Sequence, residues 1–170
     1  YLNLSNYLNP KFIFNLSLVA ENFYLNEEYD KAKRVLKNFD KKYEFYYWFR
    51  LKKEAQIIIK KQGNGKGIDF ISSKFNKIEK PNIKIVFDIA NFYKNSKNYE
   101  KAIEYYTKII LLLSDNSEIK SDLLYRRGGS YERLGYYEKA DEDLLNSLKI
   151  YPNDAYVLNY LAYSWLERDY

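Results

Sequence analysis

The 170-residue chain contains no cysteine, no histidine and no methionine. Without cysteine it can form neither a disulfide framework nor a thiolate metal site. The missing histidine removes the commonest general base and the commonest metal ligand, so we expect no catalytic residue, no metal site and no cofactor in this chain. The absence of cysteine fits reducing and oxidising compartments alike and leaves the localisation open.

Long apolar runs and blocks of one charge are missing as well. No stretch approaches the roughly 18 uncharged apolar residues that a membrane helix needs, so no membrane span is expected. The formal net charge of +5 arises from 28 basic side chains interleaved with 23 acidic ones. This mixture argues against nucleic acid as a partner, because a nucleic-acid-binding domain usually carries a basic block or face.

Small residues recur along the chain in two ladders that keep the same phase. The first ladder has spacings of 35, 35, 38 and 34 residues and consists of Ala20, Ala55, Ala90, Gly128 and Ala162. The second follows 12 residues behind the first and consists of Ala32, Gly67, Ala102 and Ala140. This period predicts a helical repeat array with two helices per repeat, each of which makes one close contact.

The clearest repeat runs from residue 121 to residue 154. Its pattern consists of Leu124, Gly128, Tyr131, Gly135, Tyr137, Ala140, Leu144, Leu148 and Pro152. This pattern resembles the tetratricopeptide repeat, although Arg127 stands where the family usually has leucine and Ser147 where it usually has alanine. Gly135 is predicted to end the first helix in a left-handed conformation, and Pro152 to end the second.

The resemblance implies an all-α fold, a right-handed superhelical solenoid of antiparallel helix pairs. The predicted organisation is the tail of a preceding repeat over 1–12, tetratricopeptide-like repeats over 13–47, 48–82, 83–120 and 121–154, and the first helix of a truncated repeat over 155–170. Because both ends stop within a repeat and Tyr1 is not an initiating methionine, we expect a fragment flanked by further repeats of the same chain. The C-terminal part looks most like bacterial members of the family, many of which are exported to the periplasm.

Two segments interrupt the repeat pattern. In the degenerate repeat over 48–82 the turn is replaced by Gly63-Asn64-Gly65-Lys66-Gly67, and these glycines predict a loop followed by a short second helix. The same segment does not match a phosphate-binding loop, which would need glycine in place of Lys60 and serine or threonine in place of Gly67. In the repeat over 83–120 the extra residues 117–120 are predicted to lie in a loop.

In the family that the chain resembles, the first helix of each repeat lines a concave groove that contacts the ligand. Carried over position by position, the resemblance implies a ligand groove formed by Phe49, Lys52, Lys53, Gln56, Lys60, Phe87, Asn91, Lys94, Asn95, Tyr125, Arg126, Arg133, Asn159 and Tyr160. Cations, amides and aromatics on one face suit an extended peptide, whose backbone pairs with amides and whose side chains fill aromatic pockets. Capture of a chaperone's terminal carboxylate is disfavoured, because Asp88 and Asp122 stand at two positions of the family's carboxylate clamp and would repel it.

The leading hypothesis is therefore a non-enzymatic scaffold that binds a partner protein or extended peptide along this groove. A second hypothesis is a regulatory or substrate-docking module of a larger enzyme whose catalytic part lies outside these residues. A flanking segment with histidine, cysteine or a glycine-rich turn between strand and helix would favour that second hypothesis. A third hypothesis, RNA binding along the groove cations, is disfavoured by the interleaved acids and would require a steep dependence of binding on salt.

Overall fold

The computed structural model describes residues 9, 12–115 and 117–168. These ranges contain nine α-helices and no strand, which confirms the predicted all-α repeat architecture. The helices form two compact units that meet in sequence at Glu79 and Lys80. None of the described helices is both long and apolar enough to cross a membrane. The predicted tail over 1–12 falls almost entirely outside the described residues.

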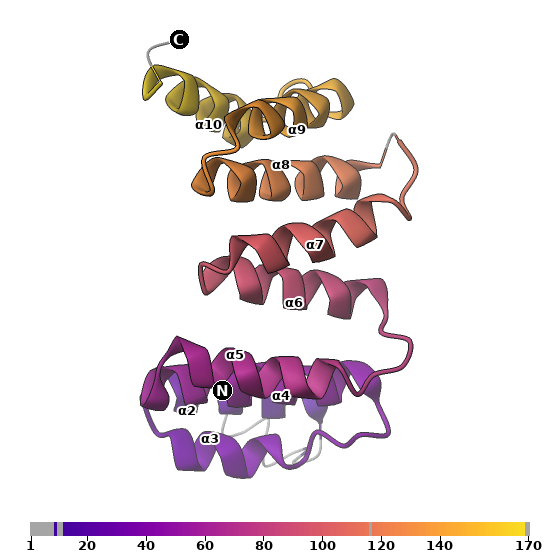
Figure 1. Ribbon diagram of the computed structural model, residues 1–170. Coiled ribbons are helices and arrows are strands. Elements are labelled where there is room, and N and C mark those ends of the chain that lie inside the picture. The colour runs from indigo at the N-terminus through magenta and orange to yellow at the C-terminus, as the bar shows by residue number, and fades with distance from the viewer. Residues whose placement is uncertain (1–8, 10–11, 116, 169–170) are drawn as a thin grey trace. The chain divides into compact units, whose positions relative to one another are not determined.

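Each unit is built of consecutive helix pairs (Figure 1). Unit 1 contains α2 (Ile13–Leu25), α3 (Tyr29–Leu36), α4 (Glu44–Gln62) and α5 (Asn64–Phe75). Unit 2 contains α6 (Ile83–Asn95), α7 (Tyr99–Ile110), α8 (Glu118–Arg133), α9 (Tyr137–Ile150) and α10 (Ala155–Leu166). We call the even-numbered helices A helices and the odd-numbered helices B helices.

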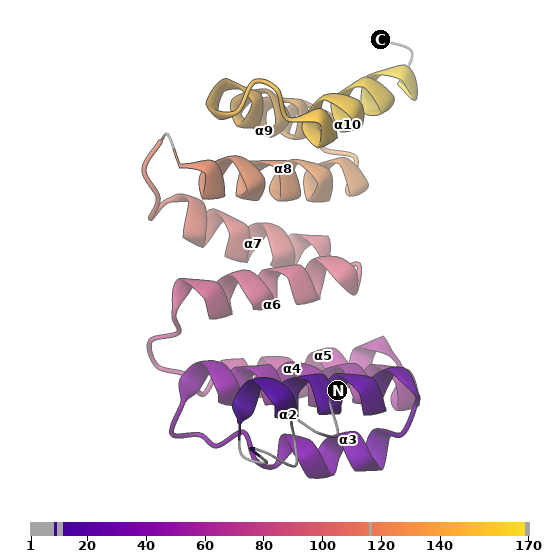
Figure 2. The same ribbon diagram turned by 180° about the vertical axis from the view of Figure 1, so that it is seen from behind.

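The A helices α2, α4, α6 and α8 each pack against the B helix that follows. In unit 1, α2 pairs with α3 and α4 with α5, while α3 also touches α4. In unit 2, α6 pairs with α7 and α8 with α9, and α7 joins the two pairs. The last helix, α10, packs against α9, which lies behind it in the second view (Figure 2).

The small-residue ladders lie where these helices cross. Ala55, Ala90, Ala102 and Ala140 are fully buried. A Cβ atom added at Gly128 would lie only 3.2 Å from the carbonyl oxygen of Ala140, so a small residue is needed for α8 and α9 to approach this closely. By contrast Ala162 of α10 is exposed, because no described helix follows α10 to cover it.

A left-handed residue ends three of the A helices at the same place in the repeat. Gly135 has a φ of 76°, as predicted, and the corresponding residues Glu27 and Lys97 have φ values of 60° and 62°. Glycine adopts this conformation without the steric cost that a side chain adds. The second pair differs, because α4 continues to Gln62 and only Gly63, with a φ of 89°, separates it from α5.

The predicted loop over residues 63–67 is wrong beyond Gly63, because α5 begins at Asn64 and includes Gly65 and Gly67. The reason is a close contact between α4 and α5, which requires glycine within the helix and which the glycine pattern alone does not reveal. A Cβ atom added at Gly67 would lie 2.3 Å from Cγ1 of Ile59 on α4, so glycine is what allows α5 to pack there.

The predicted loop over residues 117–120 is wrong for a similar reason. Ser117 is the N-cap of α8, and Glu118, Ile119 and Lys120 form its first turn. The inserted residues therefore lengthen an A helix. Likewise α4 begins at Glu44, ahead of the predicted start of its repeat at residue 48.

We expect Gly65 and Gly67 to respond in opposite ways to alanine. A Cβ atom at Gly65 would meet no atom within 4 Å, so Gly65→Ala should stabilise unit 1 by about 0.5–1 kcal/mol through helix propensity. The same change at Gly67 would force Ile59 to move and should destabilise unit 1 by about 1–3 kcal/mol. Urea unfolding followed by circular dichroism measures both free energies. Equal stability of the two variants would show that the contact between α4 and α5 is not tight.

Two departures from the family pattern form buried polar contacts between α8 and α9. The guanidinium of Arg127 donates from Nε and Nη2 to the two carboxylate oxygens of Asp143, both at 2.7 Å, and from Nη1 to Oγ1 of Thr107 at 2.9 Å. Burial raises the pKa of the Asp143 carboxyl, while Arg127 acts in the opposite direction. Ser121 and Ser147 each donate to the other's carbonyl oxygen, at 3.0 and 2.9 Å. Each unusual residue thus has a polar partner on a neighbouring helix.

Candidate functional site

The predicted groove residues divide between the two units. Those of unit 1 all lie on α4 and consist of Phe49, Lys52, Lys53, Gln56 and Lys60. Those of unit 2 lie on α6, α8 and α10 and consist of Phe87, Asn91, Lys94, Asn95, Tyr125, Arg126, Arg133, Asn159 and Tyr160. The side chains of the second group are the more extensively connected.

On α4 the predicted residues serve partly to hold unit 1 together. The ring of Phe49 packs against Phe39, with the centroids 5.2 Å apart, and contributes to the core of unit 1. Lys53 pairs with Glu21 of α2, and its ammonium lies 5.0 Å from the ring centroid of Tyr24.

The other predicted residues of α4 differ in exposure. Lys52 is half-buried, whereas Lys60 is exposed near the end of the helix. Oε1 of Gln56 is buried without a hydrogen-bond donor among the described residues. An acceptor of this kind could receive an N–H group from a ligand.

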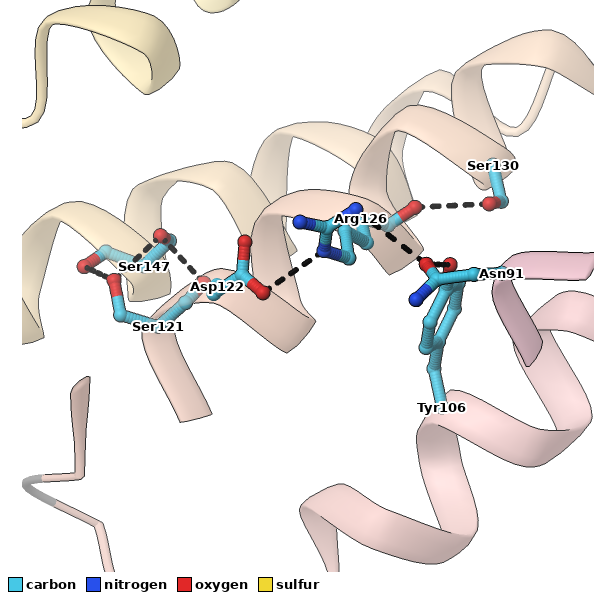
Figure 3. A network of polar contacts seen from close by, with 7 residues as sticks. All are labelled: Asn91, Tyr106, Ser121, Asp122, Arg126, Ser130 and Ser147. Atoms are coloured by element: carbon cyan, nitrogen blue, oxygen red, sulfur yellow. Dashed lines mark hydrogen bonds and ion pairs between the residues drawn. The ribbon is translucent and has the colours of Figure 1, made fainter. Parts of the chain in front are cut away.

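On unit 2 a hydrogen-bonded network joins three helices (Figure 3). Oδ1 of Asn91 on α6 accepts from the hydroxyl of Tyr106 on α7 at 2.7 Å and from Nη1 of Arg126 on α8 at 3.4 Å. Tyr106 is fully buried, and burial raises the pKa of its hydroxyl. This buried tyrosine therefore fixes the orientation of the half-buried Asn91 above it.

Arg126 is the centre of this network. Its Nε donates to Oδ2 of Asp122 at 2.8 Å, one turn earlier on α8, and its guanidinium carbon lies 5.3 Å from the ring centroid of Phe87 on α6. The carboxylate and the ring hold the guanidinium in one place without enclosing it, since the Arg126 side chain keeps 33% of its exposure.

A second group of contacts extends the site to α10. The hydroxyl of Tyr160 donates to Oε2 of Glu132 on α8 at 3.0 Å, and its ring meets that of Tyr125 edge-on with centroids 5.7 Å apart. Nε of Arg133 lies 3.6 Å from the same Glu132 oxygen. Asn95 and Asn159 are exposed on α6 and α10 and do not belong to this connected group.

Positive charge gathers near the C-terminal half of α6. Burial lowers the pKa of the Lys94 ammonium, and the positive charges of Arg126 and Arg133 lower it further, while Asp122 opposes them. A ligand carboxylate or carbonyl oxygen placed here would relieve the repulsion among these cations. The positive charge of this face is therefore suited to binding carboxylate or carbonyl oxygen atoms of a ligand.

A pocket of about 570 Å³ opens beside this network, between the first turns of α6 and α8. Its wall is mainly apolar with polar residues among it, and consists of Asn82, Ile83, Lys84, Phe87, Ile109, Glu118, Ile119, Asp122 and Leu123. A smaller pocket of about 240 Å³ shares Glu118 and Asp122 with it and is completed by Ser121, Tyr151 and Asp154. No group of three or more acidic side chains in the described ranges is placed to hold a metal ion.

Comparisons with known proteins identify the repeats. Models of the tetratricopeptide repeat match residues 83–113 and 121–154, which contain α6, α7, α9 and all of α8 except residues 118–120. Unit 2 contains two tetratricopeptide repeats. Proteins built of these repeats generally bind other proteins or peptides and are generally non-catalytic scaffolds, so the array is a protein-interaction module.

Solved structures show the same fold at low sequence identity. The MamA protein labelled AMB-1 is 15% identical with a TM-score of 0.58, and the match covers 92% of this chain and 82% of that one. A tetratricopeptide repeat-containing protein from Cytophaga hutchinsonii is 18% identical with a TM-score of 0.61, covering 99% and 64%. A chain of the Cut9–Hcn1 complex of the APC/C is 17% identical with a TM-score of 0.62, covering 99% and 32%. A comparison with curated protein sequences finds no match.

Transfer of the repeat positions thus selected some residues that are connected in unit 2, namely Asn91 with Arg126 and Tyr125 with Tyr160. It did not select Tyr106, because the transferred positions belong to A helices and Tyr106 lies on a B helix. It also did not select Glu118 and Ile119, which belong to the turn that lengthens α8. The spacing of 38 residues between Ala90 and Gly128 was the signal that could have drawn attention to this turn.

Proposed function

We propose that unit 2 binds an extended segment of a partner protein on its A-helix face, the side of α6, α8 and α10 that carries the Asn91 and Arg126 network. The observation that carries this proposal is the hydrogen-bonding state of Asn91. Its oxygen accepts from Tyr106 and Arg126, whereas its NH₂ group donates to no described residue. A partner's backbone carbonyl can receive that donor.

The surrounding side chains support the same kind of ligand. Arg126 is held by Asp122 and Phe87 and remains partly exposed, and Lys94 adds a second cation beside it. A preorganised donor set costs less conformational entropy on binding than flexible surface lysines would. The aromatic pair of Tyr125 and Tyr160 offers apolar surface next to these donors.

Selection from a display library of random peptides tests this proposal. We expect peptides selected on the native chain to lose about tenfold or more in affinity when Asn91 and Arg126 are both changed to alanine. The matched control carries Asn146→Ala and Lys139→Ala, an amide and a cation on the B helix α9. If both double variants retain the peptides equally well, the A-helix face of unit 2 is not the binding surface.

A further inference from the structure

The apolar pocket of unit 2 adjoins the Asn91 and Arg126 network and shares Phe87 and Asp122 with it. Ile119 is 60% exposed and Ile83 is 42% exposed, although both are large apolar residues in the first turn of an A helix. Together with Phe87 they line the pocket of about 570 Å³ between α6 and α8. Isolated exposed apolar residues are common, but a pocket with several of them is typical of a binding site.

The inserted residues of the chain form one wall of this pocket. Glu118 and Ile119 lie in the additional first turn of α8, which the longer spacing between Ala90 and Gly128 provides. Without that turn the pocket would lack both side chains. The insertion therefore adds an apolar residue and an acidic residue side by side at the edge of the binding face.

The smaller pocket next to it has a negative lining. Its acidic residues are Glu118, Asp122 and Asp154, and no lysine or arginine lines it among the described residues. Asp122 already pairs with Arg126, and Asp154 accepts hydrogen bonds from the first backbone N–H groups of α10. Glu118 has no such partner in the described residues and is exposed, so its charge remains available to a ligand.

We propose that the partner segment carries a bulky apolar residue with a lysine or arginine one or two positions away. The apolar side chain enters the pocket lined by Ile83, Phe87 and Ile119, and the basic side chain pairs with Glu118 at the neighbouring pocket. The two pockets share Glu118 and Asp122, and side chains two positions apart in an extended chain are separated by only about 7 Å. This inference rests on the proposed binding of an extended segment by unit 2.

The two contacts contribute differently to binding. Burial of a leucine-sized side chain corresponds to roughly a tenfold to hundredfold gain in affinity. The exposed ion pair with Glu118 adds less and weakens as salt screens it. We therefore expect the apolar residue to provide most of the affinity and the basic residue most of the selectivity between similar peptides.

The same display library, sequenced after selection, tests the motif directly. Peptides enriched on the native chain should contain an apolar residue followed or preceded by lysine or arginine within two positions. With Glu118→Lys the preference at the charged position should reverse to aspartate or glutamate, which a merely destabilised variant would not produce. With Ile119→Ala the enriched peptides should lose about threefold to tenfold in affinity.

Two control variants match these changes outside the pockets. Glu100→Lys places the same charge change in the first turn of the B helix α7, and Leu145→Ala removes a similarly exposed apolar side chain from α9. Both should leave the selected motif unchanged. Peptides that lack the motif but still depend on Asn91 and Arg126 would overturn this inference while supporting the proposed function. Peptides that depend on neither set of residues would overturn both.

Discussion

An Asp143→Ala variant is expected to lose about 3–5 kcal/mol of the free energy of unfolding of unit 2. The Arg127 and Asp143 side chains are only 17% and 5% exposed, and the substitution leaves the guanidinium buried without its counter-charge. Removing one partner of a buried ion pair is far more costly than removing both, since a single buried charge keeps its whole desolvation penalty. Urea unfolding monitored by circular dichroism gives the free energy.

A double variant isolates the cause of this loss. Arg127→Leu restores the residue that the family usually has at that position, so Arg127→Leu combined with Asp143→Ala should recover most of the lost stability. Glu104→Ala, which removes an exposed partner of Lys108 on α7, should have a far smaller effect. If the double variant is as unstable as Asp143→Ala alone, the unpaired charge is not the reason for the loss.

A Trp48→Ala variant is expected to destabilise unit 1 by about 3–5 kcal/mol. Trp48 of α4 is 2% exposed, and its ring packs edge-on against that of Phe75 on α5 with centroids 6.1 Å apart. Removal of the indole leaves a cavity that the two helices can close only in part. Hydrogen exchange measured by mass spectrometry should show the loss of protection first in α4 and α5.

The other tryptophan of the chain provides the control. Trp165 of α10 is 37% exposed, so Trp165→Ala should cost much less than Trp48→Ala. Because repeat arrays open locally, α8 and α9 should keep their protection in the Trp48→Ala variant. Equal loss of protection along the whole chain would instead indicate that the two units unfold as one.

The candidate site of unit 2 was predictable in part. Asn91, Tyr125, Arg126 and Tyr160 could be selected because the repeat places them on A helices at regular intervals. The hydrogen bond by which Tyr106 orients Asn91 could not be predicted, since Tyr106 fits the pattern of an ordinary core residue. Its hydroxyl becomes informative only when the packing of α7 against α6 places it 2.7 Å from Asn91.

At the glycine-rich segment and at the insertion, local sequence signals predicted loops where the structure has helix. Glycine lowers helix propensity by only about 1 kcal/mol, and the close contact of Gly67 with α4 outweighs that cost. At residues 117–120 the sequence contains no helix breaker, and the helix simply starts one turn earlier. In both places the local sequence is compatible with either a loop or a helix, and the packing of the helices decides for the helix.

The sequence by itself determined the all-α architecture, the pairing of helices and the places where they cross. Close crossings admit only small side chains, so these crossings are marked by Ala55 and Ala90 of the first ladder, 35 residues apart, and by Ala102 and Ala140 of the second, 38 residues apart. Only the tertiary structure decided that Asp143 pairs with Arg127 and that Ile119 lines a pocket with residues of α6. These contacts join side chains from different helices. Which side chains meet depends on how the helices pack, and the repeat period does not specify that packing.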